Sequence, residues 1–181
     1  WRVCYHGTPP GCGVIVAHPH TSNWDFVIAI LAKWSIGLPV AFLGKESLFN
    51  APVFGPFMRW CGGIPVQRQG ASGAITEMAE RIRAAQARGD RWWLAIAPEG
   101  TRSKSEDGWR SGFYHIAVAA RVPIGLAYFN FARKEVGITT FLQPSGDPEA
   151  DLPQIARWYA DHAEGRYPEL TGPVRLRRAA R

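Results

Sequence analysis

The stretch His18-Pro19-His20-Thr21-Ser22-Asn23-Trp24-Asp25 marks the point where a strand is expected to give way to a helix. The residues before it, Val14–Ala17, are apolar and mostly branched, which is typical of a short buried strand. From Asn23 to about Ser35, apolar residues recur at helical spacing. The junction therefore places an imidazole, His20, just outside a helix whose first turn contains the carboxylate of Asp25.

Predicted strands and helices alternate along the rest of the chain. This alternation favours an α/β layered fold in which helices flank a largely parallel central sheet. Because no low-complexity linker divides the chain, residues 1–181 are expected to form a single domain. The strands are expected at Val40–Leu43, Gly62–Val66, Trp92–Ala97, Ile124–Phe129 and Val136–Leu142, and the helices at Ser72–Arg88, Phe113–Ala120 and about Glu149–Glu164.

The composition is that of a globular protein, with 46% hydrophobic and 20% charged residues. The net charge of +6 favours anionic partners such as phosphorylated metabolites or an acidic membrane surface. Nucleic acid is not an expected partner, because the chain has no recognised nucleic-acid-binding motif and its aromatic residues cluster with prolines and aliphatic residues. The basic C-terminal residues 173–181 are expected to form a solvated tail.

The cysteines and the longest apolar run bear on where the chain works. Three cysteines, an odd number without metal-ligand spacing, fit a reducing compartment. The apolar run Phe26–Gly44 approaches the length of a membrane span, but Lys33 interrupts it. A buried helix followed by a turn and a short strand explains this run better than a span does.

An aromatic segment punctuated by prolines runs from Leu48 to Trp60. Two interpretations are open. Its side chains belong to the core, as in many domains, or they form an exposed patch that contacts lipid.

His20 and Asp25 are candidates for a general base and the residue that orients it. A neutral imidazole can accept a proton from an alcohol, and a carboxylate on its other nitrogen fixes the tautomer and stabilises the imidazolium. Asp25 can instead cap the helix with Ser22, three residues earlier. His20 can likewise be a structural histidine, and the pair His18 and His20 without further ligands makes a poor metal site.

A second polar stretch, Pro98-Glu99-Gly100-Thr101-Arg102-Ser103, follows the apolar run Trp92–Ala97. It supplies a carboxylate, an arginine and the backbone donors of a glycine-containing turn, which suit a phosphate or an oxyanion. Lys45 and Arg68 also follow predicted strands and are either further cations of that site or solvated surface residues. Ligands of layered α/β folds collect beyond the carboxyl ends of strands, so these residues are expected to meet His20 at one sheet edge.

The segment from His20 to Asp25 resembles the His-x4-Asp signature of the glycerolipid acyltransferase family, and Pro98–Ser103 resembles its Pro-Glu-Gly-Thr-Arg-Ser block. Both motifs in this order and at this separation are highly specific for that family. The resemblance extends to Gly62–Arg68 and Val122–Ile124 and covers roughly residues 1–145.

The resemblance implies transfer of a fatty acyl group from a thioester donor, acyl-coenzyme A or acyl carrier protein, to the hydroxyl of a lysophospholipid, typically 1-acylglycerol-3-phosphate. It implies that His20 deprotonates the acceptor hydroxyl and that Asp25 orients His20. Arg68 and Arg102 would bind the acceptor phosphate, and Glu99 would shape the acceptor site. No metal and no cofactor other than the donor are expected. The residues expected to bind substrate are Lys45, Arg68, Glu99, Gly100, Thr101 and Arg102.

A protein of this family is expected in the cytoplasm, peripherally associated with the inner face of the membrane. Two alternatives remain open at this point. The first is an acyltransferase for another hydroxyl, such as that of glycerol-3-phosphate or a lyso-aminolipid. The second is a non-catalytic protein that binds anions or a membrane surface, although anion binding needs neither His20 nor Asp25.

Overall fold

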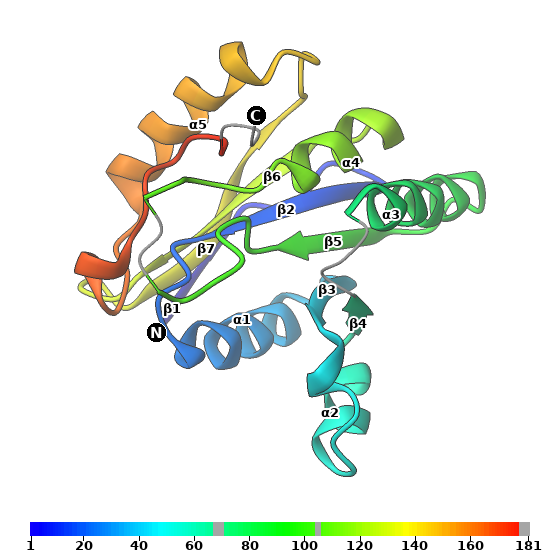
Figure 1. The fold of residues 1–181 in the computed structure, drawn as a ribbon, viewed down its shortest axis with the longest axis horizontal. Coiled ribbons are helices and arrows are strands. Elements are labelled where there is room, and N and C mark those ends of the chain that lie inside the picture. The colour runs from blue at the N-terminus through cyan, green and yellow to red at the C-terminus, as the bar shows by residue number, and fades with distance from the viewer. Residues whose placement is uncertain (67–70, 104–105, 178–181) are drawn as a thin grey trace.

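The computed structural model describes residues 1–66, 71–103 and 106–177 (Figure 1). Its centre is a seven-stranded sheet in the order β1-β7-β6-β2-β5-β3-β4. Neighbouring strands are parallel except for the antiparallel pair β6 and β7. The strands are β1 (Arg2–Tyr5), β2 (Cys12–His18), β3 (Val40–Lys45), β4 (Gly63–Val66), β5 (Trp92–Ile96), β6 (Ile124–Asn130) and β7 (Glu135–Leu142).

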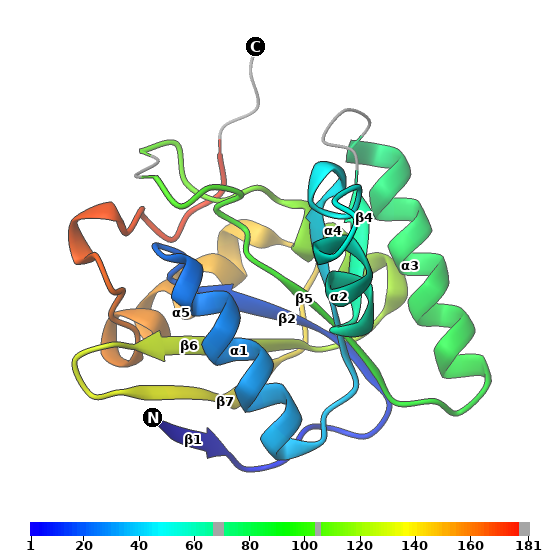
Figure 2. The same ribbon diagram turned by 90° about the horizontal axis from the view of Figure 1, so that it is seen from below.

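Helices lie on both faces of the sheet (Figures 1 and 2). Three of them, α3 (Ala71–Ala87), α4 (Gly112–Ala120) and α5 (Pro148–His162), cover one face. Helix α1 (Asn23–Ile36) and the short α2 (Phe54–Trp60) lie on the opposite side. Two 3-10 turns, η1 (Glu46–Leu48) and η2 (Pro168–Leu170), complete the named elements.

Strand β2 is buried on both faces, as its unbroken apolar run predicts. Val14 and Val16 belong to the large core between the sheet and α3, α4 and α5. Ile15 points the other way and packs with Trp93 and Ile138. This central position between β5 and β6 places the carboxyl end of β2, and the residues that follow it, in the middle of one sheet edge.

The predicted α/β fold with a largely parallel sheet is confirmed. Each predicted strand and helix is present, with ends that agree to within two residues. One strand and one helix were not predicted. Strand β1 has only four residues and pairs with β7 alone, and helix α2 contains Pro56, which hides it in the proline-punctuated segment.

The expectation of a solvated C-terminal tail is wrong for residues 173–177, and residues 178–181 lie outside the described part of the chain. The main-chain N–H of Trp109 donates to the Arg175 carbonyl at 2.6 Å, and the main-chain N–H of Arg177 donates to the Trp109 carbonyl at 2.8 Å. The Arg177 guanidinium also donates to the Gly108 carbonyl. Backbone pairing with a fully buried tryptophan therefore fixes this segment, which charge alone does not reveal.

Helix α1 is apolar on all sides, and its periodicity does not identify its buried face. Ile28 and Ala32 pack against Phe129 and Val136 of the sheet. Four of the apolar side chains whose spacing predicts the helix point outward instead. Exposed on α1 are Trp24 (54%), Val27 (42%), Leu31 (58%) and Trp34 (45%).

Lys33, which interrupts the longest apolar run, is turned back toward the protein. Its Nζ donates to the carbonyls of Val40 and Cys61, both at 2.6 Å. Burial lowers the pKa of this ammonium group. Helix α1 ends four residues later at Gly37, whose φ of 63° is left-handed. Among the described residues, none of the helices combines the length and the hydropathy that crossing a membrane requires.

Candidate active site

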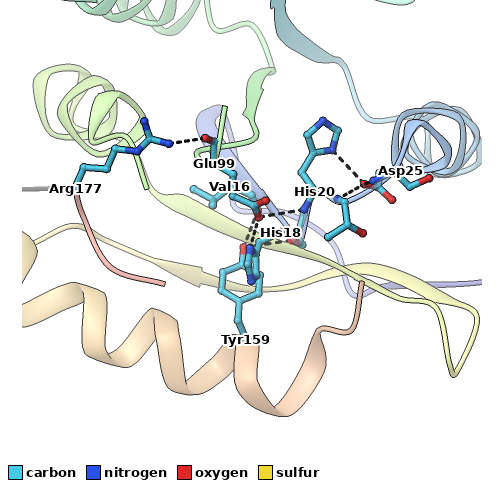
Figure 3. A network of polar contacts seen from close by, with 10 residues as sticks. Val16, His18, His20, Asp25, Glu99, Tyr159 and Arg177 are labelled. Carbon is cyan, nitrogen blue, oxygen red and sulfur yellow. Dashed lines mark hydrogen bonds and ion pairs between the residues drawn. The ribbon is translucent and has the colours of Figure 1, made fainter. Parts of the chain in front are cut away.

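The junction between β2 and α1 brings His20 and Asp25 together (Figure 3). Nδ1 of His20 lies 3.2 Å from Oδ2 of Asp25. The Asp25 side chain is 2% exposed, whereas 21% of the His20 side chain is exposed. Because Nδ1 faces the carboxylate, Nε2 is the nitrogen that can receive a proton from a bound substrate.

Asp25 serves the helix and the histidine at the same time. Its Oδ2 accepts hydrogen bonds from the N–H groups of Thr21 (2.9 Å) and Ser22 (2.8 Å). The Ser22 hydroxyl in turn accepts from the N–H of Trp24, which completes a capping box. The capping interpretation of Asp25 is thus confirmed, and the same capped turn places its carboxylate beside His20. Oδ1 is buried and has no hydrogen-bond partner among the described residues.

A second buried carboxylate, Glu99, lies under the same loop (Figure 3). Strand β5 pairs directly with β2, so the turn after β5 adjoins the residues that follow β2. Oε1 of Glu99 accepts a hydrogen bond from the His20 N–H at 3.1 Å and lies 2.5 Å from Nδ1 of His18. The side chains of His18 and Glu99 are nearly excluded from solvent. Glu99 therefore holds the backbone of His20, while Asp25 holds its ring.

His18 is enclosed by aromatic rings. The ring centroids of Trp109 and Tyr159 lie 5.1 and 5.0 Å from that of His18. The Tyr159 hydroxyl donates to the carbonyls of Val16 (2.7 Å) and Ala127 (3.2 Å), which joins α5 to β2 and β6. Burial, and to a smaller degree the negative charge of Glu99, raises the pKa of Tyr159 well above its usual value, so this hydroxyl stays a neutral donor.

The turn after β5 is shaped by a left-handed glycine and by hydrogen bonds between side chains and its main chain. Gly100 has a left-handed φ of 67°, and a Cβ there would lie 3.0 Å from Nε of Arg110. The Thr101 hydroxyl accepts a hydrogen bond from the Ser103 N–H at 3.2 Å. The guanidinium of Arg177 donates to the Glu99 carbonyl at 3.1 Å, so the C-terminal segment also holds this turn.

The other predicted site residues lie around this centre. Arg102 is exposed and lines a surface pocket of about 370 Å³. Lys45 is the exposed last residue of β3, which is separated from β2 by β5. Arg68 falls outside the described residues. The structure thus brings His20, Asp25 and Glu99 into contact and places Arg102 nearby.

Several residues of the site are not predicted by the sequence. His18 stands in the quoted stretch, but its partner Glu99 is 81 positions away. Tyr159 and the pocket residue Arg166 belong to the C-terminal part of the chain, where no motif marks them. The pocket is lined by Thr21, Ser22, Asn23, Trp24, Arg102, Arg166 and Tyr167.

Comparison with known proteins places this chain in a family. The family model described as Acyltransferase matches residues 2–125, which include β2, both polar stretches and the strands that carry them. The chain therefore belongs to the Acyltransferase family.

Two curated relatives carry the name 1-acyl-sn-glycerol-3-phosphate acyltransferase. The protein from Escherichia coli (strain K12) is 31% identical over 116 residues, and that from Salmonella typhimurium (strain LT2) is 30% identical over 116 residues. Each match covers 63% of this chain and 45% of the relative, so the chain matches less than half the length of these proteins.

A solved structure shows the same fold. The 1-acyl-sn-glycerophosphate (LPA) acyltransferase PlsC from Thermotoga maritima matches with a TM-score of 0.59 over 88% of this chain and 69% of that protein. The sequences are 18% identical, so this likeness concerns the fold alone.

Replacing Glu99 by Ala is expected to lower the free energy of unfolding by about 1–3 kcal/mol, because the His18 ring and the His20 N–H lose their buried acceptor. Chemical denaturation followed by tryptophan fluorescence measures this change. Glu77→Ala is a matched control that removes an exposed pair with Arg81 and is expected to cost less than about 1 kcal/mol. Equal losses in both variants would contradict a structural role for Glu99.

Proposed function

We propose that this chain is an O-acyltransferase that moves a fatty acyl group from a thioester donor, acyl-coenzyme A or acyl carrier protein, to the hydroxyl of a lysophospholipid. Membership of the Acyltransferase family supports the reaction class. The names of the curated relatives support 1-acylglycerol-3-phosphate as the acceptor.

One observation carries the proposal: the half-open imidazole of His20 is held at Nδ1 by the buried carboxylate of Asp25 at 3.2 Å. Capping of α1 requires Asp25 but not His20, and binding of an anion requires neither. A base oriented by a carboxylate is what direct attack by an alcohol needs. This arrangement favours catalysis over the non-catalytic alternative.

In the proposed reaction, Nε2 of His20 accepts the proton of the acceptor hydroxyl as that oxygen attacks the thioester carbonyl carbon. The new carbon–oxygen bond forms and the carbon–sulfur bond breaks, and the proton on His20 passes to the leaving thiolate. The products are the ester and a free thiol. Asp25 stabilises the imidazolium between these two transfers, while Glu99 keeps the His20 backbone in place.

The acceptor's phosphate is assigned to the cationic side of the site. Arg102 lines the pocket beside the start of α1, and a guanidinium binds phosphate through two parallel hydrogen bonds. Arg68 and Lys45 are proposed as further cations. Gly100 and Thr101 shape the turn from which Arg102 projects.

Replacing His20 by Ala is expected to lower kcat about 100- to 10,000-fold, the usual contribution of a general base. The measurement is acyl transfer from acyl-coenzyme A and from acyl carrier protein to a panel of lysolipids. His115→Ala, an exposed histidine of α4, is the control and should retain full activity. Equal turnover by wild type and His20→Ala would contradict the mechanism, and no turnover by wild type on any acceptor would contradict the function.

We also propose that the chain works at the inner face of a membrane through an exposed aromatic face on α1 and α2. Trp34 and Trp60 join the two helices, with ring centroids 5.1 Å apart, and Phe57 lies 6.1 Å from Trp60. Phe49 and Met58 of the same segment are buried, so part of Leu48–Trp60 belongs to the core and part is exposed. Contact of the exposed part with lipid is the proposal. The aromatic face consists of Trp24, Val27, Leu31, Trp34, Val53, Phe54, Phe57 and Trp60, each at least 42% exposed.

The chemistry of this aromatic face suits a lipid surface. Tryptophan and phenylalanine are favoured at the boundary between lipid and water. Helices α1 and α2 are fully described and contain one acidic residue, Asp25, which is buried. These two helices therefore present no exposed carboxylate that would repel an anionic membrane. The three free thiols, Cys4, Cys12 and Cys61, accord with the cytoplasmic side.

The double variant Trp34→Ala/Trp60→Ala is expected to bind vesicles of phosphatidylethanolamine and phosphatidylglycerol at least about tenfold more weakly, since a buried large side chain contributes about 1.5–3 kcal/mol. Liposome flotation measures the bound fraction. Val118→Ala, exposed on α4, is the control. Binding that high salt abolishes, or that the double variant retains, would contradict insertion through the aromatic face.

A further inference from the structure

The pocket that begins at Thr21 is lined by two arginines from distant parts of the chain. Arg102 comes from the turn after β5, and Arg166 comes from the segment that follows α5. The described residues that line this pocket include no carboxylate. Two guanidinium groups that line one pocket, with no carboxylate among its described lining residues to neutralise them, favour an anionic ligand.

The position of Arg166 is fixed by hydrogen bonds of its neighbours on both sides. The Glu164 N–H donates to the Phe129 carbonyl at 2.9 Å, and the Phe131 N–H donates to the Glu164 carbonyl at 3.0 Å, which joins the segment to the end of β6. On the other side, the Tyr167 N–H donates to the Thr21 hydroxyl at 3.4 Å. This segment therefore runs beside the loop that carries His20.

Gly165 makes this close approach possible. It is buried, and a Cβ at this position would lie 2.9 Å from the Thr21 hydroxyl oxygen. The Arg166 side chain is exposed, with its guanidinium carbon 5.7 Å from the ring centroids of both Trp24 and Tyr167. These rings hold the cation over the pocket while leaving its donors available.

We propose that Arg166 joins Arg102, already assigned to the acceptor's phosphate, in the subsite for that phosphate monoester, and that Arg166 is a specificity-determining residue. This inference rests on the proposed function. In 1-acylglycerol-3-phosphate the reacting hydroxyl and the phosphate are on neighbouring carbons, so the phosphate must bind close to His20. The pocket begins at Thr21, the next residue along the chain.

Arg166 lies beyond residues 2–125, the part that the family model matches. Its role therefore depends on how this chain folds its C-terminal segment back to Thr21. Coenzyme A also carries phosphate groups, so the acyl donor is a second candidate for the phosphate that this pocket binds. The two sources are separated by measuring each ligand alone.

Binding is measured by calorimetry without any acyl donor, so that the result does not depend on turnover. The probes are 1-hexanoylglycerol-3-phosphate, 1-hexanoylglycerol and coenzyme A. Arg166→Ala is expected to weaken binding of the phosphorylated acceptor about tenfold or more and to leave the other two probes unchanged. Arg166→Lys, which keeps the charge but not the two-pronged guanidinium, should recover part of the affinity.

Arg157→Ala, an exposed arginine of α5, is the matched control and should bind like wild type. Unchanged binding of the phosphorylated acceptor to Arg166→Ala would overturn the inference. Weaker binding of coenzyme A, or an equal loss for 1-hexanoylglycerol, would also overturn it. If Arg166-dependent phosphate binding is present but wild type transfers no acyl group, the subsite stands and the proposed function fails.

Discussion

Oε1 of Glu99 is shared by two groups at the end of β2, the ring of His18 and the main-chain N–H of His20. A carboxylate that is almost fully buried is costly unless its oxygens are paired, so the contacts that compensate for burial also determine where the His20 backbone lies. Because β5 pairs with β2, this contact depends on strand order, and Tyr159 secures the same strand end from α5. The position of the candidate base therefore follows from the packing of the core.

Helix α1 connects the site to the proposed membrane surface. Its capped first turn presents Asp25 to His20. Its exposed apolar side chains form the α1 part of the aromatic face, which continues into α2 through the contact of Trp34 with Trp60. Trp24 belongs both to the aromatic face and to the pocket that Arg102 and Arg166 line. In the proposed orientation, a lysophospholipid entering from the bilayer would meet the cationic pocket at the edge of the aromatic face. Its acyl chain would remain beside apolar side chains.

Local features of the site could be predicted from the sequence, whereas contacts between distant segments could not. His20 and Asp25 are five residues apart across one strand–helix junction, so their approach follows from local geometry. The pairing of Glu99 with His18 depends on β5 lying beside β2, which the order of elements along the chain does not specify. The exposed stripe of α1 was not predictable, because a helix that is apolar on all sides has no distinctive buried face. Arg166 reaches the pocket because Glu164 pairs with the backbone at the end of β6 and the Tyr167 N–H donates to the Thr21 hydroxyl.

The central proposal is that Asp25 keeps Nε2 of His20 free to accept a proton. Long-range proton–nitrogen NMR correlation of the histidine rings reports this state directly, because the two ring nitrogens of each neutral tautomer differ in chemical shift. Neutral His20 is predicted to carry its proton on Nδ1, facing Asp25, with Nε2 unprotonated. The preference should weaken in Asp25→Asn. A neutral His20 protonated at Nε2 in the wild-type protein would contradict the proposal, since the nitrogen assigned as the base would already be occupied.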